Sequence, residues 1–186
     1  MNMTSLLELD ARLSNQMRVA EKPGALRAIA AFFAHSGDSW FWAMGLLAVW
    51  IAGDSFWKEW AVVQFGSISL LALLVLLVKF RIKRRRPEGE WGRIYRSTDP
   101  HSFPSGHAAR AFLIATIAAG LGPAWLAIIL WIWAPLVALA RVAMGLHYLS
   151  DIVAGMLLGI LVALIGLQVY PPLLNWLFGI LGFSLR

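Results

Sequence analysis

The feature of this sequence that most constrains its fold is the length of the uncharged segments. Residues 60–78 and 111–140 contain no charged side chain. Hydrophobic residues make up 60% of the chain and charged residues only 14%, far from the balance of a soluble domain. Because about 20 apolar residues span the core of a bilayer, we expect an integral membrane protein. Its 186 residues have room for about five spans and short connections.

The predicted fold is all-α, a polytopic bundle of about five to six transmembrane helices in one domain over residues 1–186. The predicted spans are residues 39–52, residues 60–78, the two halves of residues 111–140 on either side of a turn at 120–123, and residues 148–169. Residues 54–59 are expected to form a polar turn. Tyr170, Pro171 and Pro172 should end the last span, which leaves an apolar tail too short to cross.

Residues 1–36 are interpreted as an N-terminal segment that does not cross the membrane. Residues 3–20 mix leucines with charges, which is typical of an interfacial amphipathic helix. Residues 25–34 are apolar but too short to span alone. Glu8 and Asp10 interrupt any apolar signal-peptide core, so we expect the first span itself to target the chain to the membrane.

The net charge of +6 comes largely from one loop. Its eight cations are Lys79, Arg81, Lys83, Arg84, Arg85, Arg86, Arg93 and Arg96. A basic loop beside a membrane span favours phosphate headgroups as its partner, and we expect no nucleic acid. The chain has no cysteine, which excludes disulfides, thiolate metal sites and a cysteine nucleophile.

Three short clusters within residues 79–151 hold the candidate functional residues. The first contains Lys79 and Arg86, the second is the sequence Pro104-Ser105-Gly106-His107, and the third contains Arg141, His147 and Asp151. Because consecutive spans alternate in direction, the ends of the predicted spans that carry these clusters should meet at one membrane face. The sequence therefore predicts one anion site at the membrane surface.

Such a site suits the hydrolysis of a phosphate ester, which requires charge neutralisation, a nucleophile and an acid. Lys79, Arg86 and Arg141 can bind the phosphoryl oxygens. Ser105 and the backbone at Gly106 lie where a helix N-terminus would favour an anion. His147 and Asp151, at i,i+4 spacing on a helix, share a face, so the carboxylate can hold one ring nitrogen. Spacing alone does not decide whether His147 or His107 attacks phosphorus.

The three clusters resemble the motifs of the type 2 phosphatidic acid phosphatase family. The resemblance implies a membrane lipid phosphatase in which His147 becomes a phosphohistidine, oriented by Asp151. It also implies that His107 protonates the leaving lipid alcohol and then activates water. The implied substrates are phosphate monoesters or diphosphates of lipids: phosphatidic acid, phosphatidylglycerol phosphate and polyprenyl phosphates or diphosphates. The family usually has serine where this chain has Ala140, which we interpret as a change in a helper group that leaves activity intact.

A metal site needs a shell of carboxylates or histidines, and the clusters contain a single acid, Asp151. We therefore expect no metal and no cofactor. By the positive-inside rule the basic face is expected to be cytoplasmic. The sequence predicts neither the particular lipid nor the oligomeric state.

Several residues and functions remain as alternatives. We interpret four cations as an ordinary membrane-surface cluster: Arg81, Lys83, Arg84 and Arg85. Structural roles are expected for His35 and His101, and a solvated loop is expected at Glu88, Glu90 and Trp91. A lipid phosphotransferase of the same fold and a non-catalytic lipid-binding protein remain open as functions. A transporter would require ionisable groups in mid-span, which the spans between the clusters lack.

Overall fold

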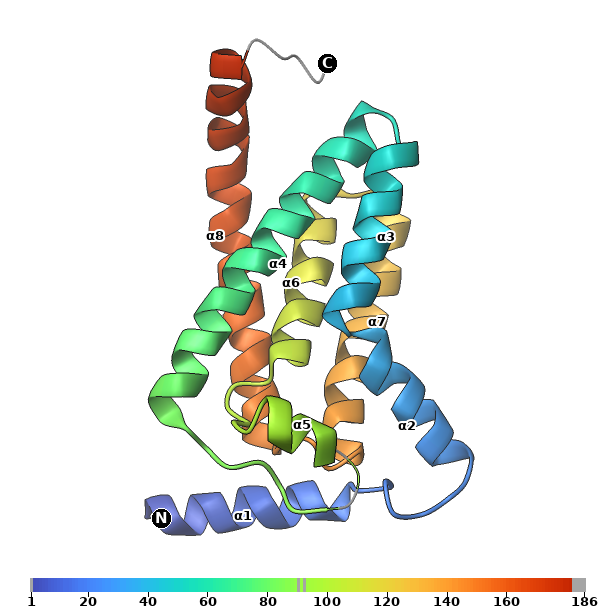
Figure 1. Ribbon diagram of the computed structural model, residues 1–186, viewed down its shortest axis with the longest axis vertical. Helices are drawn as coiled ribbons and strands as arrows, with labels where there is room; N and C mark the ends of the chain where they lie inside the picture. Colours follow the sequence, from blue (N-terminus) through green and yellow to red (C-terminus); the bar gives the residue numbers. More distant parts are fainter. Residues whose placement is uncertain (1, 90, 92, 182–186) are drawn as a thin grey trace.

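The computed structural model describes residues 2–89, 91 and 93–181, and Glu90 lies outside this range. In the described residues the chain forms eight helices (Figure 1): α1 (Met3–Gln16), α2 (Ala25–Ser36), α3 (Ser39–Ala52), α4 (Ser55–Ile82), α5 (Arg93–Thr98), α6 (Gly106–Leu121), α7 (Ala124–Ala143) and α8 (Leu149–Leu181). Within this described part of the chain, three stretches are long and apolar enough to cross a membrane: α4, α7 and Leu149–Tyr170 of α8. The shorter helices α2, α3 and α6 are also apolar. The predicted all-α membrane bundle is confirmed.

The first two predicted spans correspond to α3 and α4. Helix α3 covers residues 39–52 as predicted, but α4 is longer than residues 60–78. The polar turn predicted at 54–59 is wrong, because Asp54 caps a helix that begins at Ser55. The side chain of Asp54 accepts a hydrogen bond from the Trp57 N–H at 3.1 Å, which satisfies one of the unpaired donors of the first turn.

The remaining spans correspond to α6, α7 and α8. The predicted break near residues 120–123 is confirmed, since α6 ends at Leu121 and α7 begins at Ala124. The predicted end at Tyr170 is wrong, because the helical backbone of α8 continues through Pro171 and Pro172 to Leu181. Membrane helices tolerate proline better than exposed soluble helices, because neighbouring groups satisfy the freed carbonyls.

Helix α6 forms the centre of the bundle. Every residue from Ala108 to Ala118 is buried, and α4, α7 and α8 all contact this helix. The contact with α8 is close because two glycines face α6. A Cβ at Gly159 would lie 2.0 Å from the carbonyl oxygen of Ala109, and one at Gly155 would lie 2.5 Å from that of Ser105. Small residues of this kind let membrane helices approach each other closely.

The helix ends that carry the three clusters lie at one end of the bundle, the lower end in Figure 1. Here α4 and α7 end while α6 and α8 begin, and α5 lies at the same end. Helix α1 lies across the same end, with Leu6, Leu7 and Leu13 exposed, as expected for an interfacial helix. The predicted convergence of the clusters is therefore a feature of the fold.

Candidate active site

A cavity of about 340 Å³ lies at this end of the bundle, between α4, α6 and α7. Six of the predicted site residues line it: Lys79, Arg86, Gly106, His107, Arg141 and His147. The two others, Ser105 and Asp151, are fully buried, and the Ser105 N–H donates to the Asp151 carbonyl oxygen at 2.9 Å. The structure thus brings the three sequence clusters into one site.

His147 lies in the turn before α8, with Asp151 and Arg86 on opposite sides of its ring. We predicted that it would share a helix face with Asp151, but α8 begins only at Leu149. Nevertheless, Nδ1 of His147 lies 3.5 Å from Oδ2 of Asp151, and Nε2 lies 3.0 Å from Nη1 of Arg86. Because a guanidinium only donates hydrogen bonds, Nε2 must present its lone pair to Arg86. The ring proton therefore belongs on Nδ1, facing Asp151.

The surroundings of His147 keep its imidazole neutral. Its pKa is lowered to about 3, mainly by burial and also by the charges of Arg86 and Arg141, although Asp151 acts in the opposite direction. A neutral imidazole with a lone pair on Nε2 is the form that can attack an electrophile.

Asp151 is held by a residue that the sequence analysis assigned to the membrane surface. Nη1 of Arg84 lies 2.8 Å from Oδ1 of Asp151, and Nη2 lies 2.7 Å from Oδ2 of Asp10 in α1. The second oxygen of Asp151 accepts the Tyr148 N–H at 2.9 Å. The surface interpretation is therefore wrong for Arg84, because two acids draw its guanidinium inward.

Lys79 and Arg86 already bind a carboxylate, that of Asp99. Oδ2 of Asp99 pairs with Lys79 Nζ and lies 2.7 Å from Nη2 of Arg86. Burial raises the pKa of Asp99, but the hydrogen bond and charge of Lys79, together with the charge of Arg86, outweigh this effect and lower it overall. The pair of cations is thus an anion site, which a phosphoryl group would share with Asp99 or take over.

The remaining cation of the clusters, Arg141, is fully buried in the last turn of α7. Its Nη1 donates to the carbonyl oxygen of Ala34 at 3.1 Å, and the side chain also lines the cavity. Ala140, where the resembling family usually has serine, packs with Ala34 in a small apolar cluster. Residue 140 is not among the residues that line the cavity.

The second cluster forms the start of α6. Ser105 occupies the N-cap position, and its Oγ accepts the Ala108 N–H at 3.4 Å. Gly106 lines the cavity, and a Cβ there would make only an ordinary contact of 3.5 Å with Val75, so the protein itself does not require glycine. His107 also lines the cavity, and its Nε2 lies 2.6 Å from Oδ1 of Asp38.

Other predicted loop residues have structural positions. Arg81, Lys83, Arg85 and Glu88 are exposed. His101 pairs with Arg85 in an isolated β-bridge. Trp91, predicted as part of a solvated loop, instead packs against the small apolar cluster near Ala34. In the part of the chain that the structure describes, no group of three or more acidic or histidine side chains is arranged to hold a metal ion.

Comparison with known proteins identifies the family of the chain. The family model of the PAP2 superfamily matches residues 60–174, which includes all three clusters. The chain belongs to the PAP2 superfamily. It is a multi-pass membrane lipid phosphatase of that superfamily.

Relatives of this PAP2 protein support the assignment. It is 30% identical over 154 residues to a decaprenylphosphoryl-5-phosphoribose phosphatase of Mycobacterium tuberculosis, covering 82% of this chain and 84% of the relative. It is 31% identical over 192 aligned positions to a probable lipid phosphate phosphatase beta of Arabidopsis thaliana, covering 88% and 89% of the two chains.

Two crystal structures share its fold. A transmembrane PAP2-type phosphatidylglycerolphosphate phosphatase of Bacillus subtilis has a TM-score of 0.71 at 23% identity, covering 89% of this chain and 86% of that one. LpxE of Aquifex aeolicus has a TM-score of 0.68 at 29% identity, covering 87% and 94%.

Proposed function

We propose that the protein hydrolyses a lipid phosphate monoester or diphosphate through a phosphohistidine on His147. The observation that carries this proposal is the orientation of His147, whose Nε2 lone pair faces Arg86 at 3.0 Å while Nδ1 faces Asp151. A phosphoryl group on Arg86, Lys79 and Arg141 would lie beside that lone pair. Such positioning, with charge neutralisation, supplies most of the catalysis of phosphoryl transfer.

The reaction has two steps. First, Nε2 of His147 attacks phosphorus, the bond from phosphorus to the lipid oxygen breaks, and His107 protonates that oxygen. The proton on Nδ1 remains directed at Asp151, which stabilises the charged ring. Second, water attacks phosphorus as His107 accepts its proton, the phosphorus–nitrogen bond breaks, and inorganic phosphate leaves.

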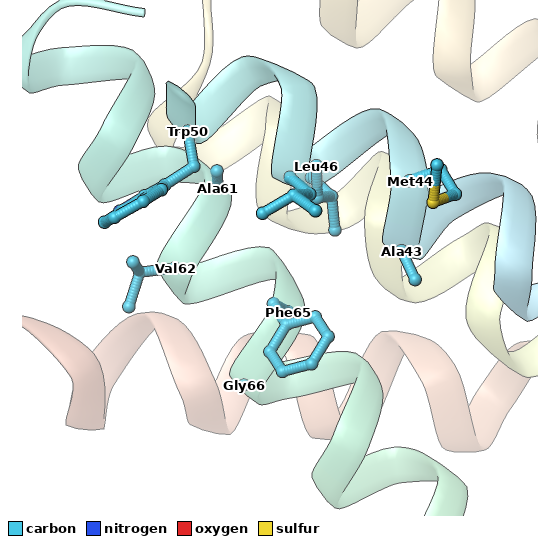
Figure 2. Close-up of a pocket in the computed structure, with 9 residues that line it drawn as sticks. Ala43, Met44, Leu46, Trp50, Ala61, Val62, Phe65 and Gly66 are labelled. Atoms are coloured by element: carbon cyan, nitrogen blue, oxygen red, sulfur yellow. The ribbon is translucent and has the colours of Figure 1, made fainter. Parts of the chain in front are cut away.

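An apolar groove along two of the helices that line the cavity supports a lipid substrate. It has a volume of about 550 Å³ and lies between α3 and α4, where Met44, Trp50 and Phe65 are among its lining residues (Figure 2). Ser39 of α3 and Ile68 of α4 line the catalytic cavity, so the groove and the cavity follow the same two helices. A hydrocarbon tail lying along α4 from Lys79 to Phe65 would run about 21 Å at 1.5 Å per residue.

The site is proposed to face the cytoplasm, on the basis of charge. Arg81, Lys83 and Arg85 are exposed at the end of the bundle that carries the site, and positive loops favour the cytoplasmic side. Because the chain lacks cysteine, single cysteines can report sidedness. In intact cells, a membrane-impermeant maleimide should label Ser55→Cys, at the opposite end, and leave Arg85→Cys unlabelled; the reverse pattern would place the site outside.

The activity is tested by phosphate release from purified protein in detergent with excess EDTA. Phosphatidic acid, phosphatidylglycerol phosphate, and polyprenyl phosphate and diphosphate form the panel. We expect release from at least one lipid, loss in His147→Ala and retention in His101→Ala, the matched control. Transfer of the phosphoryl group to an added second lipid, without release of inorganic phosphate, would indicate a phosphotransferase. The absence of any turnover would leave a lipid-binding protein.

A further inference from the structure

Asp38 occupies a helix-capping position without capping the helix. It is the N-cap residue of α3, yet its side chain makes no hydrogen bond to the first turn. Asp54, at the same position of α4, accepts the Trp57 N–H at 3.1 Å. Capping is the ordinary reason for aspartate at such a position, so Asp38 requires another explanation.

Both carboxylate oxygens of Asp38 instead face histidines. Oδ1 lies 2.6 Å from Nε2 of His107, and Oδ2 lies 3.2 Å from Nδ1 of His35. The Asp38 and His107 side chains are only 18% and 17% exposed, whereas that of His35 is 46% exposed. The shorter and more buried contact is therefore the one made to the histidine that lines the catalytic cavity.

The turn that carries Asp38 is fastened to the helix that carries His107. Arg110, one turn after His107 on α6, donates from Nε to the Gly37 carbonyl oxygen at 2.9 Å and from Nη1 to Ser39 Oγ at 2.7 Å. At Gly37 a Cβ would lie 2.9 Å from Val137 and 3.4 Å from Cδ2 of His107. The α2–α3 turn thus lies directly against the Cδ2–Nε2 edge of the His107 ring.

We propose that Asp38 is the positioning residue of His107, an inference that rests on the proposed function. Its carboxylate holds Nε2, so that the opposite ring nitrogen, Nδ1, exchanges the proton with the leaving lipid oxygen and later with water. The negative charge also stabilises the imidazolium that must exist before this proton moves. Arg110 and Arg141 oppose a further positive charge in this part of the bundle, and the Asp38 carboxylate, 2.6 Å from Nε2 of His107, acts against them.

The test compares two leaving groups, because a general acid matters most when the leaving oxygen is strongly basic. Dioctanoyl phosphatidic acid releases a basic alkoxide, whereas p-nitrophenyl phosphate releases a stable phenolate. We expect Asp38→Asn to lower kcat/KM at least about tenfold for the lipid and less than about threefold for p-nitrophenyl phosphate. The parameter kcat/KM is chosen because it reports the step in which the leaving group departs.

Two further variants define the outcome. Asp54→Asn makes the same charge-removing change at the equivalent position of α4, where asparagine still caps the helix, and should leave the ratio of the two kcat/KM values unchanged. Asp38→Glu keeps the charge, so it should restore part of the lipid activity relative to Asp38→Asn. If Asp38→Asn does not fold, Asp38→Glu takes its place, because its displaced carboxylate should still lower kcat/KM more for the lipid than for p-nitrophenyl phosphate. Inhibition by orthovanadate, which reports the phosphate site, should change less than about threefold in every folded variant, since none of them alters a phosphate-binding cation.

An equal loss on both substrates, or no loss on either, would overturn the role of Asp38 while leaving the phosphatase activity established by the wild type. A wild-type protein that hydrolyses neither substrate, nor any lipid of the panel above, would instead overturn the proposed function, and this inference with it.

Discussion

The Arg84 guanidinium lies 2.8 Å from Oδ1 of Asp151 and 2.7 Å from Oδ2 of Asp10, so one side chain joins the acid behind His147 to the helix across the end of the bundle. Asp151 is fully buried, and a buried acid that loses its partner is destabilised. The orientation of His147 therefore depends on a residue that the sequence analysis assigned to the membrane surface.

Replacement of Arg84 tests this dependence. We expect Arg84→Gln to lower kcat on a lipid phosphate about tenfold or more, because a freed Asp151 no longer holds Nδ1 of His147 in place. Arg85→Gln is the matched control, since Arg85 is the adjacent exposed arginine and should change kcat less than about twofold. Equal kcat values for the two variants would show that Arg84 belongs to the surface cluster after all.

Asp99 should compete with phosphate for Lys79 and Arg86. Its carboxylate pairs with both, so Asp99→Asn should make inorganic phosphate a better inhibitor, by about threefold to tenfold, because a like charge leaves the site. Glu88→Gln, an exposed acid in the same loop, should have no effect. Weaker inhibition in Asp99→Asn would mean that Asp99 holds the cations in the position that phosphate requires.

His147 should stay neutral well below its ordinary titration range. Its pKa is lowered from 6.5 to about 3, mainly by burial. Between these values the unfolded chain binds more protons than the folded one, so the contribution of His147 to stability is full above about pH 6.5 and declines as the pH falls towards 3. NMR titration of labelled histidine rings, with His147→Gln for assignment, should show no midpoint for His147 above pH 5. A midpoint near 6.5 would contradict its burial as the controlling cause.

Close packing of α6 and α8 should tolerate no side chain at Gly159. A Cβ there would lie 2.0 Å from the backbone of Ala109, and backbone cannot move aside as a side chain can. Gly159→Ala should therefore lower the midpoint of thermal unfolding in detergent by several degrees or prevent folding. Gly45→Ala, in the open on α3, should leave the midpoint unchanged or raise it slightly. The prediction fails if both variants unfold at the wild-type temperature.

The sequence predicted the parts of this molecule that depend on local pattern. Apolar length located the spans, and their alternating direction brought His107 and His147 to one end. The sequence pattern did not predict that α8 continues past Pro171, because the groups that hydrogen-bond to carbonyls freed by a proline come from outside the helix.

The partners of the proposed catalytic residues were also missed. Arg84 contacts Asp151 across 67 positions, and Asp38 contacts His107 across 69. No periodicity or motif links residues so far apart, and a single acid at the start of a helix is ordinarily a cap. Asp99 was missed for the same reason, because only the folded loop places it against Lys79.

The central claim is that His147 carries the phosphoryl group. The most direct measurement is trapping of protein-bound label from dioctanoyl phosphatidic acid with a radioactive phosphate, in excess EDTA and with an alkaline detergent quench. We predict an alkali-stable, acid-labile label on the peptide that contains residue 147, present in His101→Asn and absent in His147→Asn. A label that persists in His147→Asn, or that forms only when a metal ion is added, would contradict the account.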